Sequence, residues 1–232
     1  MLRNCKLLVL LKFPWFNFYT FVAIMEDKKQ FILKNVGKLY LRFGIRSVTM
    51  DDVATEFGIS KKTLYQYFKD KADLVSHVID YYLANPVFNL TDESNGNAID
   101  RFFELRAHVL NMLKYFHNNI EHDLKKLYPE LYKKVHDIKR KRIFESTVQN
   151  VTVGIESGLY RQDLDVHLIA KLQVGRMLLT LNPDYEIFTE TELANIELFD
   201  KVVETHMYSI CTEEGLNYYK KQLNIIKNEA KN

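Results

Sequence analysis

The chain has 232 residues, of which 47% are hydrophobic and 27% charged, and this composition excludes general disorder. Its net charge is only +2, so any nucleic-acid-binding surface must come from local clustering of basic residues. Four prolines and eight glycines in this length favour an all-helical fold over a sheet with many turns. The two cysteines have no metal or redox spacing, which indicates a reducing, cytoplasmic setting.

Residues 1–24 form a separate segment. Arg3 and Lys6 precede an apolar run, which Lys12 and Pro14 interrupt, so the segment resembles a weak signal peptide or an imperfect membrane span. No small-residue cleavage site follows. We expect a non-native or disordered extension here, with a membrane anchor or a packed segment as the alternatives.

The next segment is expected to be a helix from about Lys28 to Arg42. Ile32, Val36 and Leu39 fall on one face at helical spacing. Gly44 provides a C-terminal stop, because glycine readily adopts the left-handed conformation that ends helices.

Two short helices joined by a tight turn are predicted between residues 49 and 68. Thr49 and Ser60 are suitable N-caps for the first and second helix, and Gly58 suits the turn between them. Leu64 and Phe68 lie four residues apart and are expected to anchor the second helix in a core.

A fourth helix is predicted from the cap at Asp70 to about Leu83, and Asn85-Pro86 with the polar run after it marks a boundary. We therefore expect an N-terminal domain over residues 25–83 and a larger helical domain over 84–232.

The larger domain is expected to hold several long helices and a short amphipathic tail. Asp165 and Thr191 are the expected caps of the last two long helices. The expected helices span residues 99–119, 130–154, 166–181 and 191–214, and the tail spans 216–227.

The sequence TMDDVATEFG followed by GISKKTLYQYFKDKADLV resembles the N-terminal DNA-binding domain of TetR-type transcriptional regulators. The resemblance covers Phe31 to Leu83. It implies an all-α protein, with an N-terminal three-helix helix-turn-helix DNA-binding domain and a larger helical dimerisation and ligand-binding domain.

The resemblance also implies which residues bind double-stranded DNA. Ser60, Lys61, Lys62 and Thr63 lie where the family's second short helix meets DNA, and Tyr65, Tyr67 and Lys71 fall on its phosphate ligands. Thr49 matches the hydroxyl that clamps the DNA backbone. The chain departs from the family at Lys62, where many members have glycine or proline.

Elementary physics gives the same assignment. Lysines and hydroxyls at a helix N-terminus add charge and donors to the positive end of the helix dipole, which suits phosphate. Gln66 is suited to the N6 and N7 edge of adenine, and Lys61 or Lys62 to guanine. The alternative is that Tyr65 only packs and that Lys71 is ordinary solvated surface.

A single such helix reads too few base pairs to select one site, so a two-fold dimer is expected, with half-sites about 34–36 Å apart. The last two long helices are the expected interface, although their apolar stripes are also compatible with packing inside one subunit. The stripe residues are Ile169, Leu172, Met177, Leu178, Leu181, Ile196, Phe199, Val202, Val203, Met207 and Ile210.

The resemblance implies a small-molecule effector that releases a repressor from its operator through a movement of the fourth helix. We expect the pocket to be aromatic and to take a largely apolar ligand. Its expected lining is Phe102, His108, Met112, Tyr115 and Phe116. The alternatives are a constitutive or protein-controlled DNA-binding dimer without a pocket, and a membrane-tethered regulator.

Enzymatic activity, a cofactor and a metal site are not expected. The closest acid–histidine group, His117, His122 and Asp123, lacks the usual spacing of a helical zinc site. The sequence also has no glycine-rich phosphate loop and no nucleophile elbow.

Overall fold

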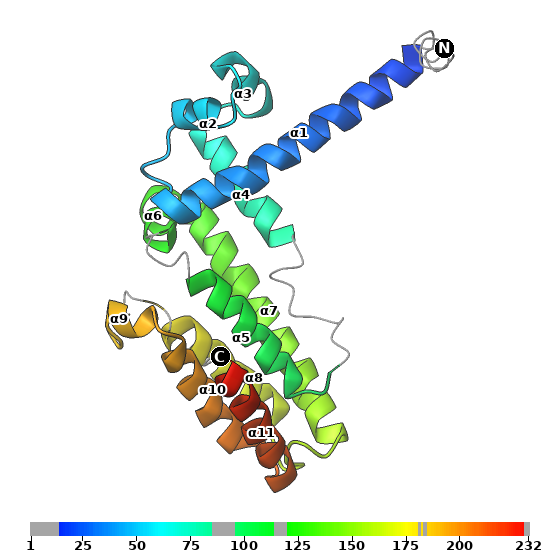
Figure 1. Ribbon diagram of the computed structural model, residues 1–232, viewed down its shortest axis with the longest axis vertical. Coiled ribbons are helices and arrows are strands. Elements are labelled where there is room, and N and C mark those ends of the chain that lie inside the picture. The colour runs from blue at the N-terminus through cyan, green and yellow to red at the C-terminus, as the bar shows by residue number, and fades with distance from the viewer. Residues whose placement is uncertain (1–13, 85–95, 114–119, 181, 183–184, 230–232) are drawn as a thin grey trace. The chain divides into compact units, whose positions relative to one another are not determined.

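The computed structural model describes residues 14–84, 96–113, 120–180, 182 and 185–229. Helices joined by short connections make up this part of the chain, which confirms the all-helical prediction (Figure 1). Two compact units are present. The first comprises Met1–Ala84 with Asn118–Leu131, and the second comprises Asn85–His117 with Tyr132–Asn232.

Helix α1 spans Pro14–Phe43 and so begins well before the expected start near Lys28. Proline is favourable in the first turn of a helix, where its missing N–H has no partner to lose. Ile32, Val36 and Tyr40 are buried, and Gly44 ends the helix at a φ of 78°.

Three further helices complete the predicted helix-turn-helix arrangement: α2 (Met50–Glu56), α3 (Lys61–Tyr67) and α4 (Lys71–Ala84). Helix α4 packs against α1 (Figure 1), where the Tyr82 hydroxyl donates to the Lys34 carbonyl over 2.9 Å. Leu64 and Phe68 are buried, as predicted, and Gly58 adopts a φ of 60° in the turn.

Helix α6 (Ile120–Leu127) belongs to the first unit, although some thirty residues of the second unit separate it from α4 in the chain. Leu124 and Asp123 are buried, and the Asp123 carboxylate accepts a hydrogen bond from the Arg46 N–H over 2.8 Å. The first unit is therefore built from two separate stretches of sequence.

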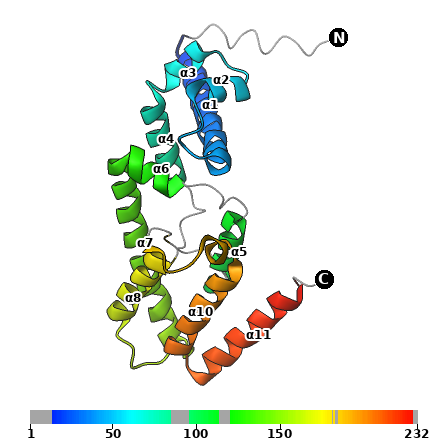
Figure 2. The ribbon, with the colours of Figure 1, turned by 90° about the vertical axis from the view of Figure 1, so that its left-hand side faces the viewer.

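The second unit contains α5 (Asp100–Leu113), α7 (Pro129–Glu156, from Tyr132), α8 (Val166–Thr180), α9 (Glu190–Leu193), α10 (Ile196–Ile210) and α11 (Glu213–Glu229). Helix α10 packs against α5 (Figure 2). The core draws on α7, α10 and α11, with Val151, Phe199, Met207 and Tyr219 among its buried residues.

The turn between α7 and α8 is fixed by the buried side chain of Tyr160. Its hydroxyl donates to Asn150 Oδ1 over 3.1 Å, and Asn150 Nδ2 donates to the Ala98 carbonyl over 2.7 Å. Asp165 caps α8 as predicted, accepting from the Leu168 N–H over 3.0 Å.

The expected helix from Thr191 to Glu214 is wrong, because two local signals divide this segment. Thr189 caps the short helix α9, and the Asn195 side chain accepts from the Glu197 N–H to start α10. At the other end the chain leaves the helix at Cys211, which pairs with Tyr160 in an isolated bridge.

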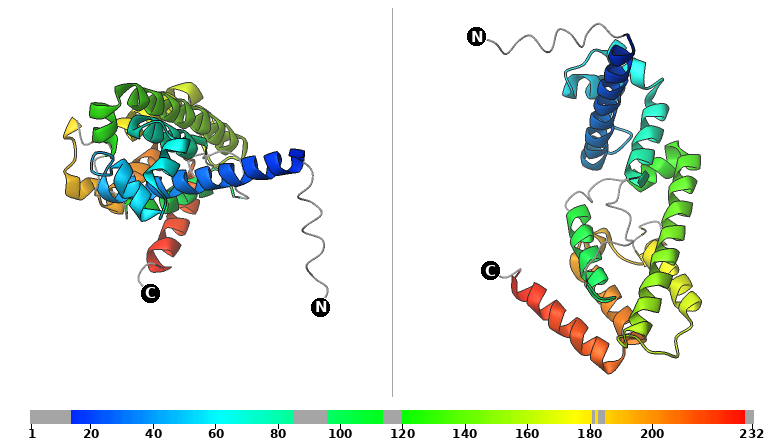
Figure 3. Two further views of the ribbon diagram at one scale, coloured as in Figure 1. Left: turned by 90° about the horizontal axis from the view of Figure 1, so that it is seen from above. Right: turned by 90° about the vertical axis from the view of Figure 1, so that its right-hand side faces the viewer.

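The expected short tail is instead the full helix α11, which turns back from the end of α10 (Figure 3). Thr212 N–H donates to the Leu159 carbonyl over 3.0 Å at the junction. Tyr219 and Leu223 of α11 are buried, so this helix is part of the core.

Candidate nucleic-acid interface

The N-terminus of α3 is held by its hydroxyl cap. Ser60 Oγ accepts from the Thr63 N–H over 3.0 Å and lies 2.8 Å from Thr63 Oγ1. Both side chains lie at the surface of the first turn, as the DNA-binding assignment requires, and their hydroxyls retain further hydrogen-bonding capacity.

One side of α3 faces solvent. Lys61, Lys62 and Gln66 are exposed, and the Tyr65 side chain retains 50% of its accessible surface. Tyr67 is half-buried, and its ring centroid lies 6.2 Å from that of Phe68. The side of α3 that carries Leu64 is buried, so the exposed side is available to a partner.

An acidic neighbour engages Lys61. Its Nζ lies 2.7 Å from Asp51 Oδ2 of α2, and this hydrogen bond and charge raise the pKa of Lys61. Both groups are largely exposed, so the pair contributes little to stability and Lys61 can exchange Asp51 for a phosphate.

Thr49 forms a complete capping box with Asp52. Its hydroxyl donates to Asp52 Oδ2 over 2.7 Å and its N–H donates to the same oxygen over 2.8 Å, while Asp52 N–H donates back to Thr49 Oγ1. These hydrogen bonds lower the pKa of Asp52. Thr49 therefore fixes the start of α2 in addition to its expected role at the DNA backbone.

Lys71 lies beside the link between α1 and α2. Its Nζ donates to the Arg46 carbonyl over 3.0 Å, and burial lowers its pKa, against the opposing attraction of Asp123 and Asp52. Arg46 is exposed on this link and was not selected from the sequence. The sequence feature that indicates Arg46 is a basic side chain three residues before the helix cap Thr49.

The expected ligand pocket is described only at Phe102, which is partly buried and packs on the core of the second unit. The side chains of His108 and Met112 lie outside the described residues, as do Tyr115 and Phe116 altogether.

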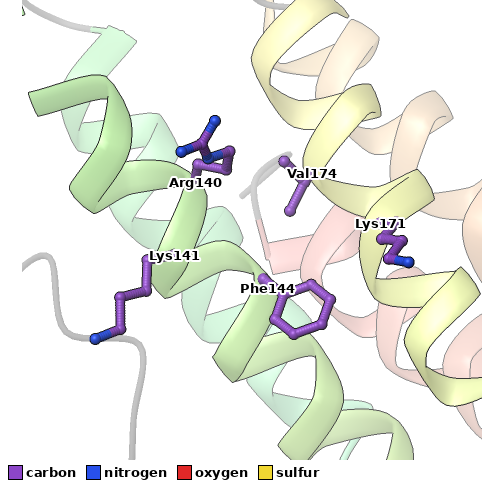
Figure 4. Close-up of a pocket in the computed structure, with 5 residues that line it drawn as sticks. All are labelled: Arg140, Lys141, Phe144, Lys171 and Val174. Carbon is purple, nitrogen blue, oxygen red and sulfur yellow. The ribbon is translucent and has the colours of Figure 1, made fainter. Parts of the chain in front are cut away.

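A cavity of about 310 Å³ lies elsewhere, between α7 and α8 (Figure 4). Its lining consists of Arg140, Lys141, Phe144, Lys171 and Val174. The Phe144 ring points into the space between the two helices, whereas Lys141 points away from α8.

The apolar residues expected at a dimer interface divide into three groups by burial. Ile169, Met177 and Ile196 are partly buried against the core of the second unit. Four residues of α10 are buried in the subunit's own core, which agrees with the alternative that the stripes pack inside one subunit. They are Phe199, Val203, Met207 and Ile210. Leu172 of α8 is 53% exposed and remains available. Leu168 and Leu179, not selected from the sequence, are exposed at helical spacing from Leu172. Leu181 lies outside the described residues.

Among the described residues, no helix is long and apolar enough to cross a membrane, and no group of three acidic, histidine or cysteine side chains is arranged to hold a metal ion. His117 lies outside the described residues. The carboxylate of Asp123 instead binds the backbone of the link at Arg46.

Comparison with known proteins places this geometry in a family. The model of the bacterial regulatory proteins of the tetR family matches residues 35–78, which run from α1 through α4. The chain is 32% identical to the transcriptional regulator YerO of Bacillus subtilis over 75 residues, 31% of this chain, and that match spans only 26% of YerO.

Two other relatives are similar over more of their length. The regulator SAR2658 of Staphylococcus aureus is 24% identical over 164 residues, covering 57% of this chain and 88% of that protein. A transcriptional regulator from Saccharomonospora viridis, solved in complex with choline, superposes with a TM-score of 0.63 at 16% identity, covering 81% of this chain and all of that one. The helix-turn-helix segment of this chain, residues 35–78, therefore belongs to the TetR family of bacterial regulatory proteins, and the chain as a whole is similar to transcriptional regulators.

Proposed function

We propose that the protein is a repressor that binds a palindromic operator as a homodimer in the cytoplasm and is released by a small molecule. The observation that carries the DNA-binding part is the exposed side of α3. It presents Lys61, Lys62, Tyr65 and Gln66 around a capped helix N-terminus, while Leu64 holds the opposite side in the core.

The proposed DNA contacts are of two kinds, contacts to phosphates and contacts to bases. Ser60 and Thr63 supply hydroxyls and Lys62 supplies charge to phosphates at the start of α3, while Tyr65 and Tyr67 supply phenolic donors. Thr49 and Lys71 contact the DNA backbone beside the link that carries Arg46. Gln66 reads adenine through its side-chain amide, and Lys61 reads guanine or phosphate after leaving Asp51.

Dimerisation and release involve the second unit. Leu168, Leu172 and Leu179 give α8 an exposed apolar stripe, which supports a two-fold interface through α8 and α10. The choline complex of the Saccharomonospora regulator supports small-molecule binding by a protein of this fold. Effector binding shifts the spacing of the two reading helices, and a coupling of about 1–3 kcal/mol weakens DNA binding about 5- to 150-fold.

The test is an electrophoretic mobility shift on the inverted repeat upstream of the gene, at two salt concentrations. We expect a shift that weakens steeply with salt, because phosphate contacts release counterions. Gln66→Ala should lose discrimination at one A·T pair in each half-site, whereas Gln162→Ala, an exposed glutamine of the second unit, should bind normally. Absence of a shift on any upstream palindrome at low salt rejects the proposal.

A further inference from the structure

His206 of α10 is a buried polar residue with no partner. Only 2% of its surface is exposed, and within the described part of the chain neither ring nitrogen has a hydrogen-bond partner. A neutral imidazole carries one N–H donor and one acceptor, and buried groups of this kind are normally satisfied. This residue therefore needs a physical explanation.

Arg176 of α8 is a second polar group that lacks an adequate partner among the described residues, and it carries a charge. Burial lowers its pKa, and among the described residues its Nη1 donates to the neutral Gln173 Oε1 over 3.1 Å, with no carboxylate bound to it. Arg106 of the same unit differs, since its Nε and Nη2 bind the two oxygens of Asp200 at 2.6 and 2.9 Å. Arg176 is partly buried without such a partner among the described residues.

The charge of Arg176 acts electrostatically on His206. The positive charge of Arg176 adds to burial in lowering the pKa of His206 to about 3, so the imidazole is neutral at physiological pH. The Phe102 ring of α5 lies 5.7 Å from the imidazole ring, centroid to centroid. We call Phe102, Gln173, Arg176 and His206 the His206 centre, and it draws on three helices of one unit.

The hydrogen-bond donors of the His206 centre match one class of ligand. A guanidinium matches two acceptor oxygens in its plane, and a neutral imidazole offers one N–H to a third lone pair. The centre carries one positive charge, which suits a monoanion, and Phe102 with the neighbouring core residue Met207 suits an apolar body.

We propose that the His206 centre binds a small organic carboxylate with an aromatic or aliphatic body. Its carboxylate accepts from the Arg176 guanidinium and from the His206 N–H, and its body lies against Phe102. This inference rests on the proposed effector control and narrows the effector from a largely apolar molecule to an organic acid.

The cavity between α7 and α8 is a weaker candidate for the same ligand. Two of its cations already have acids: Arg140 lies 3.0 Å from Asp137, and Lys141 lies 3.8 Å from Glu145. Lys171 lines the same cavity but is exposed, so water solvates its charge. This cavity provides a control site for the experiment.

The experiment measures binding of benzoate and octanoate to the full-length protein by calorimetry and thermal unfolding, against benzamide and octanamide as neutral isosteres. We expect at least one acid to bind about ten-fold or more tightly than its amide and to raise the unfolding midpoint. Arg176→Met and His206→Leu should each remove this preference, whereas Lys171→Met should keep it.

A second measurement separates binding from folding. Without ligand, Arg176→Met should unfold at the same or a higher temperature than the natural protein, because it removes an unpaired, half-buried charge. Acids that bind no better than their amides overturn the inference, as does a preference lost in Lys171→Met and kept in Arg176→Met. A lower midpoint for Arg176→Met with unchanged acid binding would assign Arg176 a purely structural role and also overturn it.

The mobility shift on the upstream repeat, run on the same samples, keeps the two proposals apart. A protein that prefers acids but shifts no DNA leaves the His206 centre in place and rejects the regulator proposal. A protein that shifts the DNA without preferring acids rejects only the organic-acid inference.

Discussion

At the start of α3, neighbouring polar residues have different physical tasks. Ser60 caps the helix, Lys61 is held by Asp51 at 2.7 Å, and Lys62 is exposed on the same turn. Asp51 also places a negative charge next to a surface that must approach phosphates. On the proposed function, the acid would oppose DNA binding while adding little to stability.

Asp51→Asn should tighten DNA binding several-fold, because it removes that repulsion and frees Lys61. Mobility-shift titrations at several salt concentrations would measure this, with a steeper salt dependence expected for the variant. Asp52→Ala is the control, since it removes the acceptor of the capping box with Thr49 and should lower stability instead. Unchanged or weaker binding by Asp51→Asn would show that Lys61 does not reach DNA.

His206 should make the protein acid-sensitive. Its folded pKa of about 3 lies below the unfolded value of about 6.5, so the unfolded state binds the proton more readily. Its effect on the free energy of unfolding is absent above about pH 7, and stability is lost as the pH falls from 6.5 towards 3, at up to about 1.4 kcal/mol per pH unit.

Urea unfolding of the natural protein and of His206→Leu at pH 7, 5.5 and 4.5 would check this. The variant should lose less stability on acidification, and the difference between the two proteins isolates this histidine from titrating carboxylates. Exposed His122, changed to glutamine, is the control. Parallel pH profiles for the natural protein and His206→Leu would contradict the expectation.

At the scale of elements, glycines in two helix interiors have opposite roles. A Cβ on Gly154 of α7 would overlap the ring of Tyr160, which is fully buried and whose hydroxyl donates to Asn150. A Cβ on Gly175 of α8 would meet nothing within 4 Å. The first glycine permits the close approach of the α7–α8 turn, and the second only weakens its helix.

Gly154→Ala should therefore destabilise the protein by about 2 kcal/mol or more, because the ring cannot move out of the core. Gly175→Ala should stabilise it by up to about 1 kcal/mol through helix propensity. Denaturant unfolding of both variants gives the comparison. A Gly154→Ala protein as stable as the natural one would mean that the Tyr160 contact is looser than the structure has it.

At the scale of the whole molecule, the operator recognition that we propose would use a second copy of the chain. Most of the apolar residues of α10 are used inside the subunit, so the stripe of Leu168, Leu172 and Leu179 on α8 is the main apolar surface left for an interface through these two helices. An exposed apolar stripe of this kind is typical of an association site.

Leu172→Glu should convert the proposed dimer to monomers and weaken operator binding, because the proposed α8 interface would bring two like charges together. Sedimentation at several micromolar concentrations measures the first effect and a mobility shift the second. Leu127→Glu on α6, where the leucine is 42% exposed, is the matched control and should remain dimeric. A Leu172→Glu protein that stays dimeric would place the interface elsewhere.

The sequence by itself determined the features that depend on local chemistry. Caps such as Thr49, Ser60 and Asp165, the turn at Gly58 and the buried anchors Leu64 and Phe68 were predictable, because each depends on residues within a few positions of it. The exposed side of α3, and with it the candidate DNA-binding surface, follows from the same local pattern.

Only the tertiary structure decided which apolar stripes are buried and which polar groups lack partners. The Phe199 and Met207 stripe packs inside the subunit, α6 contacts the link at Arg46 through Asp123, and Arg176 binds no acid among the described residues. These depend on contacts between helices distant in sequence, which hydrophobic periodicity does not specify. Periodicity shows that a face is apolar but cannot identify what covers it.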